Sequence, residues 1–552
     1  MNQFPTTQIK ITPLGGAPNV HDNMWVYESD NDIFIVDCGM GFPEEGVSGV
    51  DLTIPDISYL KDKQSKIRGF VVTHGHEDHI GGFPYIIPQM REGIPIYTSK
   101  LAAGFLKEKF REFRIDPKIL NVVKDRQPVM LGDFEVKMIP VTHSVPDTKH
   151  LIVKTPMGNI YHGSDFKFDW TPVGQELPDI QSMTRAGAEG VVLLLSDCLR
   201  SEKAGYSLSE AIVEDSFERE FRGETNRLVV TTMSSNISRI QQALWVAKRN
   251  NRKVAFVGFS VERNVKVAAE LGFLNIPPRL VVDKKKMFTL PKDEQCLIIA
   301  GSQGQMGSSL ERIATGDHKS VKLDPGDKVV FSADPIPGNE SNVYRLIDLL
   351  STHDINVSYS DISSDLHVSG HASAKEIMML IAMTKPKFAI PTGGTHRHNI
   401  QFRKLAVEMG IKEENVLMPE NQSIIIESGG VVRLGDKLDL KSVYVESGLI
   451  TQDDAHIMDR KMMFQEGAVV VVLGIHKDGG LKDLDIIAKG INIQIDPKAM
   501  QTIKEQFATV MGTQDMTRDR LYSKDRISKE ISRLFIEHIG KNPVVIPIII
   551  EE

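Results

Sequence analysis

The chain has 552 residues, of which 41% are hydrophobic and 25% are charged, and its formal net charge is −8 at pH 7. This length allows three or four structural units with separate cores, and the composition is ordinary for soluble globular proteins. The negative charge argues against a nonspecific nucleic-acid coat, so a polyanionic substrate would have to bind in a local cleft.

The cysteines and the amino terminus bear on the cellular compartment. Cys38, Cys198 and Cys296 are far apart and form no CxxC pair. This spacing favours a reduced cytosolic compartment and argues against both a disulfide framework and a thiolate zinc site. The first six residues contain no secretory signal pattern, and no later run approaches the length of a membrane span. We therefore expect a cytoplasmic protein that does not associate with membranes.

The first elements are three strands, expected at residues 9–14, 24–27 and 32–36. Asp37-Cys38-Gly39 ends the third strand. An aspartate followed by glycine is a common turn former, but Asp37 is equally consistent with a carboxylate that orients a metal-bound histidine. Both interpretations stay open at this point.

The apolar run 70–72 leads into Thr73-His74-Gly75-His76-Glu77-Asp78-His79, and a helix is expected from about Phe83. This cluster of imidazoles and a carboxylate follows a strand, where α/β folds bind ligands. Imidazole suits Zn²⁺ or another borderline transition metal, and Asp78 adds a harder oxygen ligand. Because a metal site needs three or more ligands, others must come from later in the chain.

Further polar side chains follow later predicted strands. A helix at 101–113 precedes a strand at 134–141, and His143 comes just after that strand. Residues 151–154 and 159–162 predict a hairpin that runs into Asp165, and a strand at 191–195 ends at Asp197. These positions form a rim of candidate ligands.

From about residue 205 to 365 the pattern changes to alternating strands and helices, which predicts a parallel α/β insert. We expect strands at 227–232, 254–258, 296–300 and 329–333, and helices at 237–248 and 265–271. Polar loops such as Ser234-Ser235-Asn236 follow these strands and offer unpaired N–H groups to phosphate. Taken singly, each loop is a weak signal and is better explained as an ordinary connection between a strand and a helix.

After the insert, the chain returns to the first domain and then forms a last region. Ser373 and Glu376 form a capping-box pattern for a helix that runs to about residue 383. A short polar passage begins near Asp454. Residues 526–539 have apolar positions at helical spacing, and 544–550 predict a buried strand.

In this order, Asp37, His74 to His79, His143 and Asp165 resemble the metallo-β-lactamase fold. The segments 37–39, 49–56, 73–82, 143–147 and 165–169 resemble the ribonuclease J family of the β-CASP branch, over nearly the whole length. The resemblance implies an α/β fold class: a metallo-β-lactamase αββα sandwich with an inserted β-CASP parallel α/β domain and a small α+β carboxy-terminal domain. The implied boundaries are 1–205 and 366–450 for the sandwich, 206–365 for the insert, 451–465 for a linker, and 466–552 for the carboxy-terminal assembly domain.

The resemblance also implies the roles of individual residues. His74, His76 and His143 would hold one metal, Asp78 and His79 a second, and Asp165 would bridge them, with Asp37 orienting a metal-bound histidine. Two Zn²⁺ per subunit are expected, with Mn²⁺ or Mg²⁺ as alternatives. Asp78, Asp197 and His371 are the implied catalytic residues, with Asp197 orienting His371 and His371 assisting the leaving oxygen. The implied substrate-binding residues are Ser234, Ser235, Asn236, His367, Val368, Ser369, Gly370 and His371.

The sequence departs from the family pattern at one implied metal ligand. Where the family has Pro-Val-His-Gly-Glu, this chain has Pro391-Thr392-Gly393-Gly394-Thr395-His396. Gly393 has no ligand atom. Either His396 reaches the site from the same loop, or a water fills the position, or His396 and His398 face solvent. Smaller departures are Gly16 to His21, Cys198 to Arg200, and Ser238 in place of a histidine.

The implied function is a metal-dependent ribonuclease that hydrolyses single-stranded RNA carrying a 5′ monophosphate. It would act as a 5′-to-3′ exonuclease, with endonuclease action as a second mode, in rRNA maturation and mRNA decay. The alternative is a weakly active or inactive paralogue that binds RNA or an active partner subunit. A homodimer or tetramer is expected, with a ribonuclease J paralogue or a degradosome as further candidate partners. An enzyme acting on small esters or lactams is disfavoured, because it would not need the large insert.

Overall fold

The computed structural model describes residues 6–43, 47, 49–451, 454–476, 480–491, 497–511 and 520–551. The expectation that the amino terminus contains no secretory signal pattern concerns mainly residues 1–5, which lie outside the described residues. The chain divides into two compact units, Met1–Gly41 with Ile54–Ser442 and Phe42–Thr53 with Val443–Glu552. In the described residues, none of the helices is long and apolar enough to cross a membrane.

The larger unit contains two sheets that pack face to face. Alternating apolar residues from both sheets fill the space between them, including Trp25, Phe34, Phe134 and Leu193. The first sheet has the order β20 (Val431–Lys437), β19 (Gln422–Glu427), β1 (Gln8–Gly15), β2 (Met24–Glu28), β3 (Ile33–Val36), β5 (Ile67–Val72), β6 (Ile96–Thr98) and β7 (Leu120–Val122). The second has the order β18 (Phe388–Thr392), β12 (Val191–Asp197), β11 (Gly158–His162), β10 (Lys149–Thr155), β9 (Phe134–Pro140) and β8 (Pro128–Leu131).

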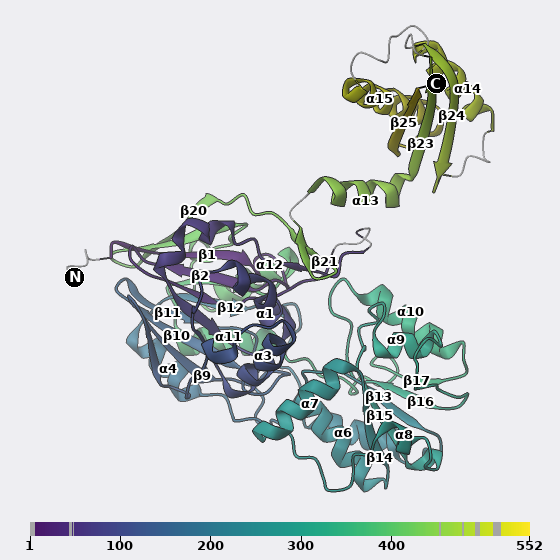
Figure 1. Ribbon diagram of the computed structural model, residues 1–552. Helices are drawn as coiled ribbons and strands as arrows, with labels where there is room; N and C mark the ends of the chain where they lie inside the picture. Colours follow the sequence, from purple (N-terminus) through teal and green to yellow (C-terminus); the bar gives the residue numbers. More distant parts are fainter. Residues whose placement is uncertain are drawn as a thin grey trace. The chain divides into compact units, whose positions relative to one another are not determined.

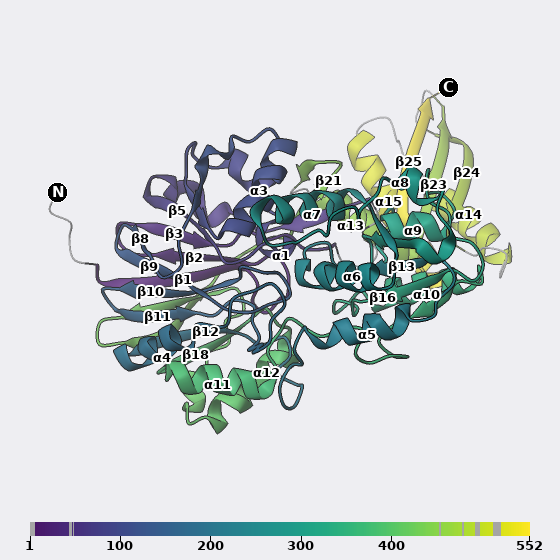
Figure 2. The same ribbon diagram turned by 90° about the horizontal axis from the view of Figure 1, so that it is seen from below.

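Helices cover the outer faces of both sheets, and Figure 2 shows α3 on one side of the sandwich with α11 and α12 on the other. Helix α3 (Lys100–Glu112) belongs to the first side, and Phe83 of α2 (Phe83–Ile86) packs against Phe110 of α3 and Phe70 of β5. Helices α4 (Ile180–Glu189), α11 (Ala374–Thr384) and α12 (His396–Glu408) belong to the second side. The short helix α1 (Glu77–Ile80) follows β5 in the chain. The predicted αββα sandwich is confirmed. The predicted hairpin is also present, since β10 pairs with β11 from Leu151↔His162 to Thr155↔Gly158.

The predicted parallel insert is confirmed as a five-stranded sheet in which every pairing is parallel. Its strand order is β14 (Lys253–Val257), β15 (Gln295–Ile299), β13 (Leu228–Thr231), β16 (Lys328–Phe331) and β17 (Asn356–Ser358). Its helices are α5 (Ile212–Phe221), labelled in Figure 2, and α6 (Ile237–Arg249), α7 (Phe259–Leu271), α8 (Lys284–Met287), α9 (Ser309–Ala314) and α10 (Glu340–Ser351), labelled in Figure 1. The insert packs on the sandwich where α7 meets α3, because Gly104 leaves room for Val267 and Leu271.

The return segment re-enters the sandwich through α11, whose predicted capping box is present. The Ser373 hydroxyl accepts from the backbone of Glu376, and the Glu376 carboxylate accepts from the Ser373 N–H. Strand β18 then adds to the second sheet beside β12. This pairing brings the loop after β18 next to Asp197, the last residue of β12.

The smaller unit has a three-stranded sheet of β24 (Leu481–Lys489), β23 (Ala468–Ile475) and β25 (Val544–Glu551). Helices α14 (Pro497–Met511) and α15 (Arg520–Ile539) pack against it through apolar residues such as Ile531 and Phe535. A second small sheet contains β22 (Leu449–Thr451), β21 (Val443–Glu446) and β4 (Leu52–Ile54).

The passage expected as a linker, 451–465, largely forms a helix, α13 (Asp454–Glu466), and as a domain boundary it stays a prediction. One expectation for this unit is wrong. Strand β25 is not buried: it lies at the edge of its sheet, and Ile546, Ile548 and Ile550 are 41–46% exposed. An all-apolar run does not distinguish a strand covered on both faces from one covered on one face.

Candidate metal centre

The candidate site lies where several strands of the two sheets end. Strand β5 ends at Val72 and leads directly into His74 and His76. Strand β11 ends three residues before Asp165, and β12 ends at Asp197. The fold therefore brings together polar side chains that are up to 123 positions apart in sequence (His74 to Asp197).

Three overlapping groups of side chains form at this position. His74, His76, His143 and Asp165 each place one donor atom within 4.8 Å of the others, and so do Asp78, His79 and Asp165, and Asp165, Asp197 and His371. Asp165 belongs to all three groups. Its Oδ2 lies 3.4 Å from Nε2 of His79 and 3.7 Å from Nε2 of both His74 and His143.

The hydrogen bonds behind the imidazoles determine which ring nitrogen faces the centre. The Thr73 hydroxyl donates its single proton to Asp37 (2.7 Å), so it accepts from Nδ1 of His74 (3.0 Å). Nδ1 of His79 donates to Asp37 (2.7 Å), and Nδ1 of His143 donates to the Gly370 carbonyl (2.7 Å). In each ring the Nε2 lone pair is therefore directed inward, as a metal ligand requires.

A cation fits this arrangement. Nδ1 of His76 lies 3.2 Å from Nε2 of His74 and 3.1 Å from Nε2 of His143, and at most one of these contacts can contain a proton. Nε2 of His79 faces the carboxylates of Asp78 and Asp165, which are also acceptors, at 3.4 Å. Four imidazoles and two carboxylates suit Zn²⁺ or a similar divalent metal.

The electrostatics of the site agree with this interpretation. Burial and the neighbouring imidazoles hold the pKa values of His74 and His143 well below the ordinary value, so both rings are neutral and can bind a metal. Burial would also lower the pKa of His79, but the carboxylates of Asp78, Asp165 and Asp37 raise it well above the ordinary value. Without a metal, a proton on His79 compensates these negative charges.

His371 lies against His143, with the two ring centroids 4.9 Å apart. Its Nδ1 contacts Oδ2 of Asp197 at 2.8 Å, and Oδ1 of Asp197 accepts from the N–H of Leu199. Burial would lower the pKa of His371, but Asp197 and Asp165 raise it to about 9. The ring is therefore protonated at neutral pH and can donate a proton to a bound group.

The segment that contains His371 is fixed by a fully buried arginine. Arg239 of α6 forms two hydrogen bonds with Glu210, at 2.9 and 2.7 Å, and donates to Nδ1 of His367 and the Val368 carbonyl. Gly370 lies so close to His143 that a Cβ atom there would be 2.8 Å from the imidazole. The Arg239 contacts and the lack of a side chain at Gly370 therefore hold the 367–371 segment against the metal centre.

The predicted phosphate loop precedes α6. Ser234 and Ser235 are half-buried, whereas Asn236 is buried and caps α6 by accepting from the N–H of Arg239 at 3.1 Å. Gln175 donates to the carbonyl of His143 and to the hydroxyl of Ser238, which places this end of α6 beside His143. The side chain of Asn236 is therefore engaged by its own helix.

The loop after β18 does not supply a replacement ligand. Gly393 has a φ of +64°, and a Cβ built on it would lie 3.8 Å from Oδ1 of Asp165 and 3.9 Å from Oδ1 of Asp197, with no closer atom. His396 is the first residue of α12, and its side chain is 68% exposed, 3.8 Å from Glu420. His398 is buried and caps α12, so it is not solvent-facing as one alternative had it.

Sequence reasoning missed three side chains at the centre. The Asn23 amide donates to Asp78 (3.4 Å) and lies 3.3 Å from Nε2 of His79, and the Ser144 hydroxyl contacts Nε2 of His76 at 3.2 Å. Gln175 is the third. Each comes from a loop without a repeated pattern, so no sequence signal indicated it.

Comparisons with known proteins agree with this geometry. Four parts of the chain match known domain families: a beta-lactamase superfamily domain (residues 33–185), the ribonuclease J beta-CASP domain (225–350), a Zn-dependent metallo-hydrolase RNA specificity domain (354–419) and the ribonuclease J C-terminal domain (455–552).

Whole-length similarities point the same way. The chain is 37% identical to ribonuclease J of Synechocystis sp., over 90% of this chain and 78% of that one. It is 34% identical to ribonuclease J of Thermus thermophilus (99% and 96%) and 31% identical to ribonuclease J2 of Bacillus subtilis (100% of both). Its fold resembles the crystal structure of a protein of unknown function from Enterococcus faecalis V583, with a TM-score of 0.53 and 14% identity over 76% of this chain and 100% of that one.

Proposed function

The chain belongs to the ribonuclease J family of metal-dependent ribonucleases, and we propose that it hydrolyses single-stranded RNA from a 5′-monophosphate end in the 5′-to-3′ direction, with endonuclease action as a second mode. The observation that supports this proposal most directly is the position of Asp165, whose carboxylate faces two groups of imidazoles and carboxylates. The comparisons favour this enzyme over the non-catalytic paralogue that the sequence left open.

We propose that His74, His76 and His143 hold one ion, that Asp78 and His79 hold a second, and that Asp165 is shared. The donor set favours Zn²⁺, with Mn²⁺ or Mg²⁺ as alternatives. Such ions, when bound, activate water and neutralise charge on a phosphodiester. Asp37 and Thr73 orient His79 and His74, and Asn23 holds Asp78.

We place the 5′ end of the RNA beside the loop of Ser234, Ser235 and Asn236 and the 367–371 segment. Gln175 joins α6 to His143, so this loop lies next to the metal centre. The N–H groups that precede α6 suit a terminal phosphate. A 5′ phosphate held here leaves the first phosphodiester of the strand at the metal centre, with its 3′ leaving oxygen next to His371.

The direct test is hydrolysis of a single-stranded RNA that carries a labelled 5′ monophosphate, with Zn²⁺ or Mn²⁺ added. We expect release of labelled mononucleotide, and no release by His76→Ala, because His76 lies between two other ligands of the same ion. RNA of the same sequence with a 5′ hydroxyl is the substrate control. Binding without cleavage by the wild-type protein would contradict the proposal.

Gly393→His should tighten binding of the second ion by about tenfold or more, an effect typical of added metal-site contacts. The Cβ position faces Asp165 in open space, and histidine tolerates a positive φ better than most residues. Gly393→Ala is the control, since it introduces the same backbone strain without an imidazole. Competition with a chelating dye measures the affinity. Equal affinities for the two variants would refute the idea that this position can supply a ligand.

We propose that two subunits associate through the smaller unit. On the sheet face away from α14 and α15, Ile546 and Ile548 of β25 lie beside Val470 and Val472 of β23. An exposed apolar sheet face of this kind is a typical association surface. Ile548→Lys should therefore shift a dimer to monomers in sedimentation, whereas Val431→Lys on β20, which is 53% exposed, should not. An unchanged oligomer in Ile548→Lys would exclude this face.

A further inference from the structure

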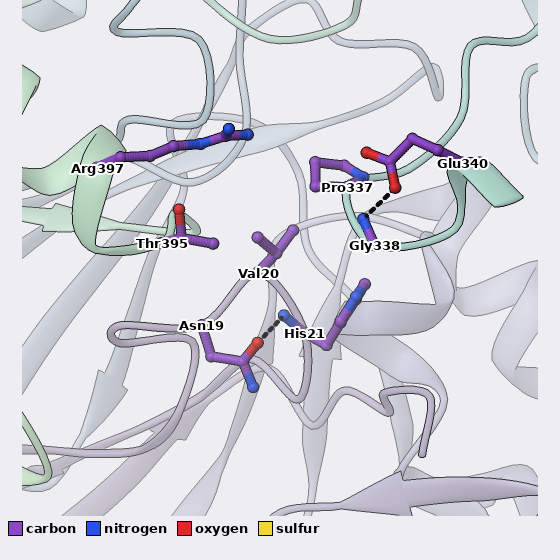
Figure 3. Close-up of a pocket in the computed structure, with 8 residues that line it drawn as sticks. All are labelled: Asn19, Val20, His21, Pro337, Gly338, Glu340, Thr395 and Arg397. Carbon is purple, nitrogen blue, oxygen red and sulfur yellow. Dashed lines mark hydrogen bonds between the residues drawn. The ribbon is translucent and has the colours of Figure 1, made fainter. Parts of the chain in front are cut away.

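A cavity of about 360 Å³ opens among three loops of the larger unit. Asn19, Val20 and His21 come from the loop before β2, Pro337 and Gly338 from the loop before α10, and Thr395 and Arg397 from the start of α12. Figure 3 shows these side chains around one shared space, with Val20 and His21 between the α12 residues and the Pro337 loop. A space of this size can hold one nucleotide.

This cavity adjoins different residues of the centre from those that the loop containing Ser234 adjoins. The N–H of Gly393 donates to the Gly16 carbonyl, and the N–H of Asn23 donates to the Asp78 carbonyl, so the loops around the cavity border Gly393 and Asp78. The Ser234 loop borders His143 instead, through Gln175. A strand held by its 5′ end at the Ser234 loop and cleaved at the centre would continue toward the cavity.

The lining residues suit a nucleotide. Arg397 is 63% exposed and lies 3.7 Å from Glu202, a long ion pair that leaves its guanidinium accessible to a phosphate. Val20 and Pro337 offer apolar surface to a base. The Glu340 carboxylate is engaged by the N–H of Gly338 at 2.8 Å, so it is held at the edge of the cavity rather than in its centre.

We propose that this cavity binds one nucleotide of single-stranded RNA on the 3′ side of the cleaved bond, with Arg397 at its phosphate and Val20 and Pro337 against its base. The inference rests on the proposed ribonuclease function. Two of the three lining loops, those of Gly16 to His21 and Gly393 to His396, are where this sequence departs from the family pattern. Part of the lining, Asn19, Val20, His21 and Thr395, therefore comes from positions that depart from the pattern.

The test compares Arg397→Ala with Arg403→Ala, a control on the same helix whose side chain is 39% exposed and pairs with Glu413. Both variants, as full-length protein in EDTA, are titrated with a ten-nucleotide RNA that has a 5′ phosphate and a 3′ fluorophore. Arg397→Ala should bind about tenfold more weakly, and the slope of log K against log salt should fall by about 0.7, as expected for one lost phosphate contact on a single strand. Arg403→Ala should match the wild-type protein.

Neutral methylphosphonates then locate the contact. Each phosphodiester of the same RNA is replaced in turn; one replacement should weaken binding to the wild-type protein by about tenfold and leave binding to Arg397→Ala unchanged. Val20→Trp, which fills the cavity without a change of charge, should weaken binding with an unchanged salt slope.

The outcomes separate the two proposals. If the wild-type protein neither binds nor cleaves this RNA when metal is restored, the ribonuclease function fails. If it binds and cleaves but no methylphosphonate effect depends on Arg397, only the cavity proposal is overturned. Equal losses of RNA affinity in Arg397→Ala and Arg403→Ala would also overturn the cavity proposal, because the loss of one positive charge anywhere on the helix would then explain the weaker binding.

Discussion

Asp165→Asn should lower the rate of hydrolysis of 5′-monophosphorylated RNA by about a thousandfold or more. The substitution keeps the shape of the side chain but removes the negative charge that faces His74, His79 and His143 at 3.4–3.7 Å. Asp165 is the one residue common to the three side-chain groups found among the described residues. Its loss should therefore weaken both proposed ions together, whereas His76→Ala should chiefly affect one.

Metal content and thermal unfolding give readouts independent of activity. Elemental analysis after gel filtration should find fewer ions per chain in Asp165→Asn than in the wild-type protein. Added Zn²⁺ should raise the unfolding temperature of the wild-type protein, because a ligand that binds only the folded state stabilises it, and this rise should be smaller in the variant. Asp361→Asn on the insert surface serves as the matched control. A variant with full metal content and full activity would show that Asp165 does not hold the ions.

Much of the fold could be predicted because its signals are local. The strands at 24–27 and 32–36, the hairpin at 151–162 and the capping box at Ser373 depend on neighbouring residues, and each is present. The histidine-rich loop was detectable for the same reason: its candidate ligands lie within six residues, after one strand. The αββα arrangement and the order of the distant segments came from the resemblance to a family rather than from these local patterns.

Contacts between distant loops could not be predicted. Asn23, Ser144 and Gln175 reach the centre only because the sheets bring their loops together, and asparagine, serine and glutamine in loops are common everywhere. The exposure of β25 depends on its position at a sheet edge, which an apolar run does not encode. His396 was one alternative ligand from sequence, but it begins α12, and the start of that helix directs it to Glu420 instead.

The sequence alone also left the role of Asp37 open between a turn former and a carboxylate that orients a histidine. In the structure its carboxylate contacts His79. Its two oxygens accept three hydrogen bonds, from the Thr73 N–H, the Thr73 hydroxyl and Nδ1 of His79. A buried carboxylate satisfied in this way fixes the orientation of two neighbouring rings, His74 and His79.

His371→Gln should lower the turnover of RNA by about a hundredfold to ten-thousandfold, with unchanged metal content. Gln retains a donor for the Asp197 carboxylate, which lies 2.8 Å from Nδ1 of His371, but it cannot transfer a proton. In the proposed reaction, hydrolysis leaves a 3′ oxygen that must gain a proton as its bond to phosphorus breaks. Protonated His371 is the group positioned to give it, because Asp197 and Asp165 raise its pKa to about 9.

The leaving group separates this role from a structural one. The p-nitrophenyl ester of thymidine 5′-phosphate releases an anion that needs no proton, so His371→Gln should hydrolyse it within about threefold of the wild-type rate. The wild-type protein should also lose activity toward RNA at alkaline pH, as His371 gives up its proton, and the variant should lack this decline. Asp197→Asn should show the same pattern with a smaller loss of activity toward RNA. This substitution leaves the imidazole of His371 in place but removes the charge that keeps it protonated. Equal losses on both substrates would instead indicate that His371 shapes the site without acting as the acid.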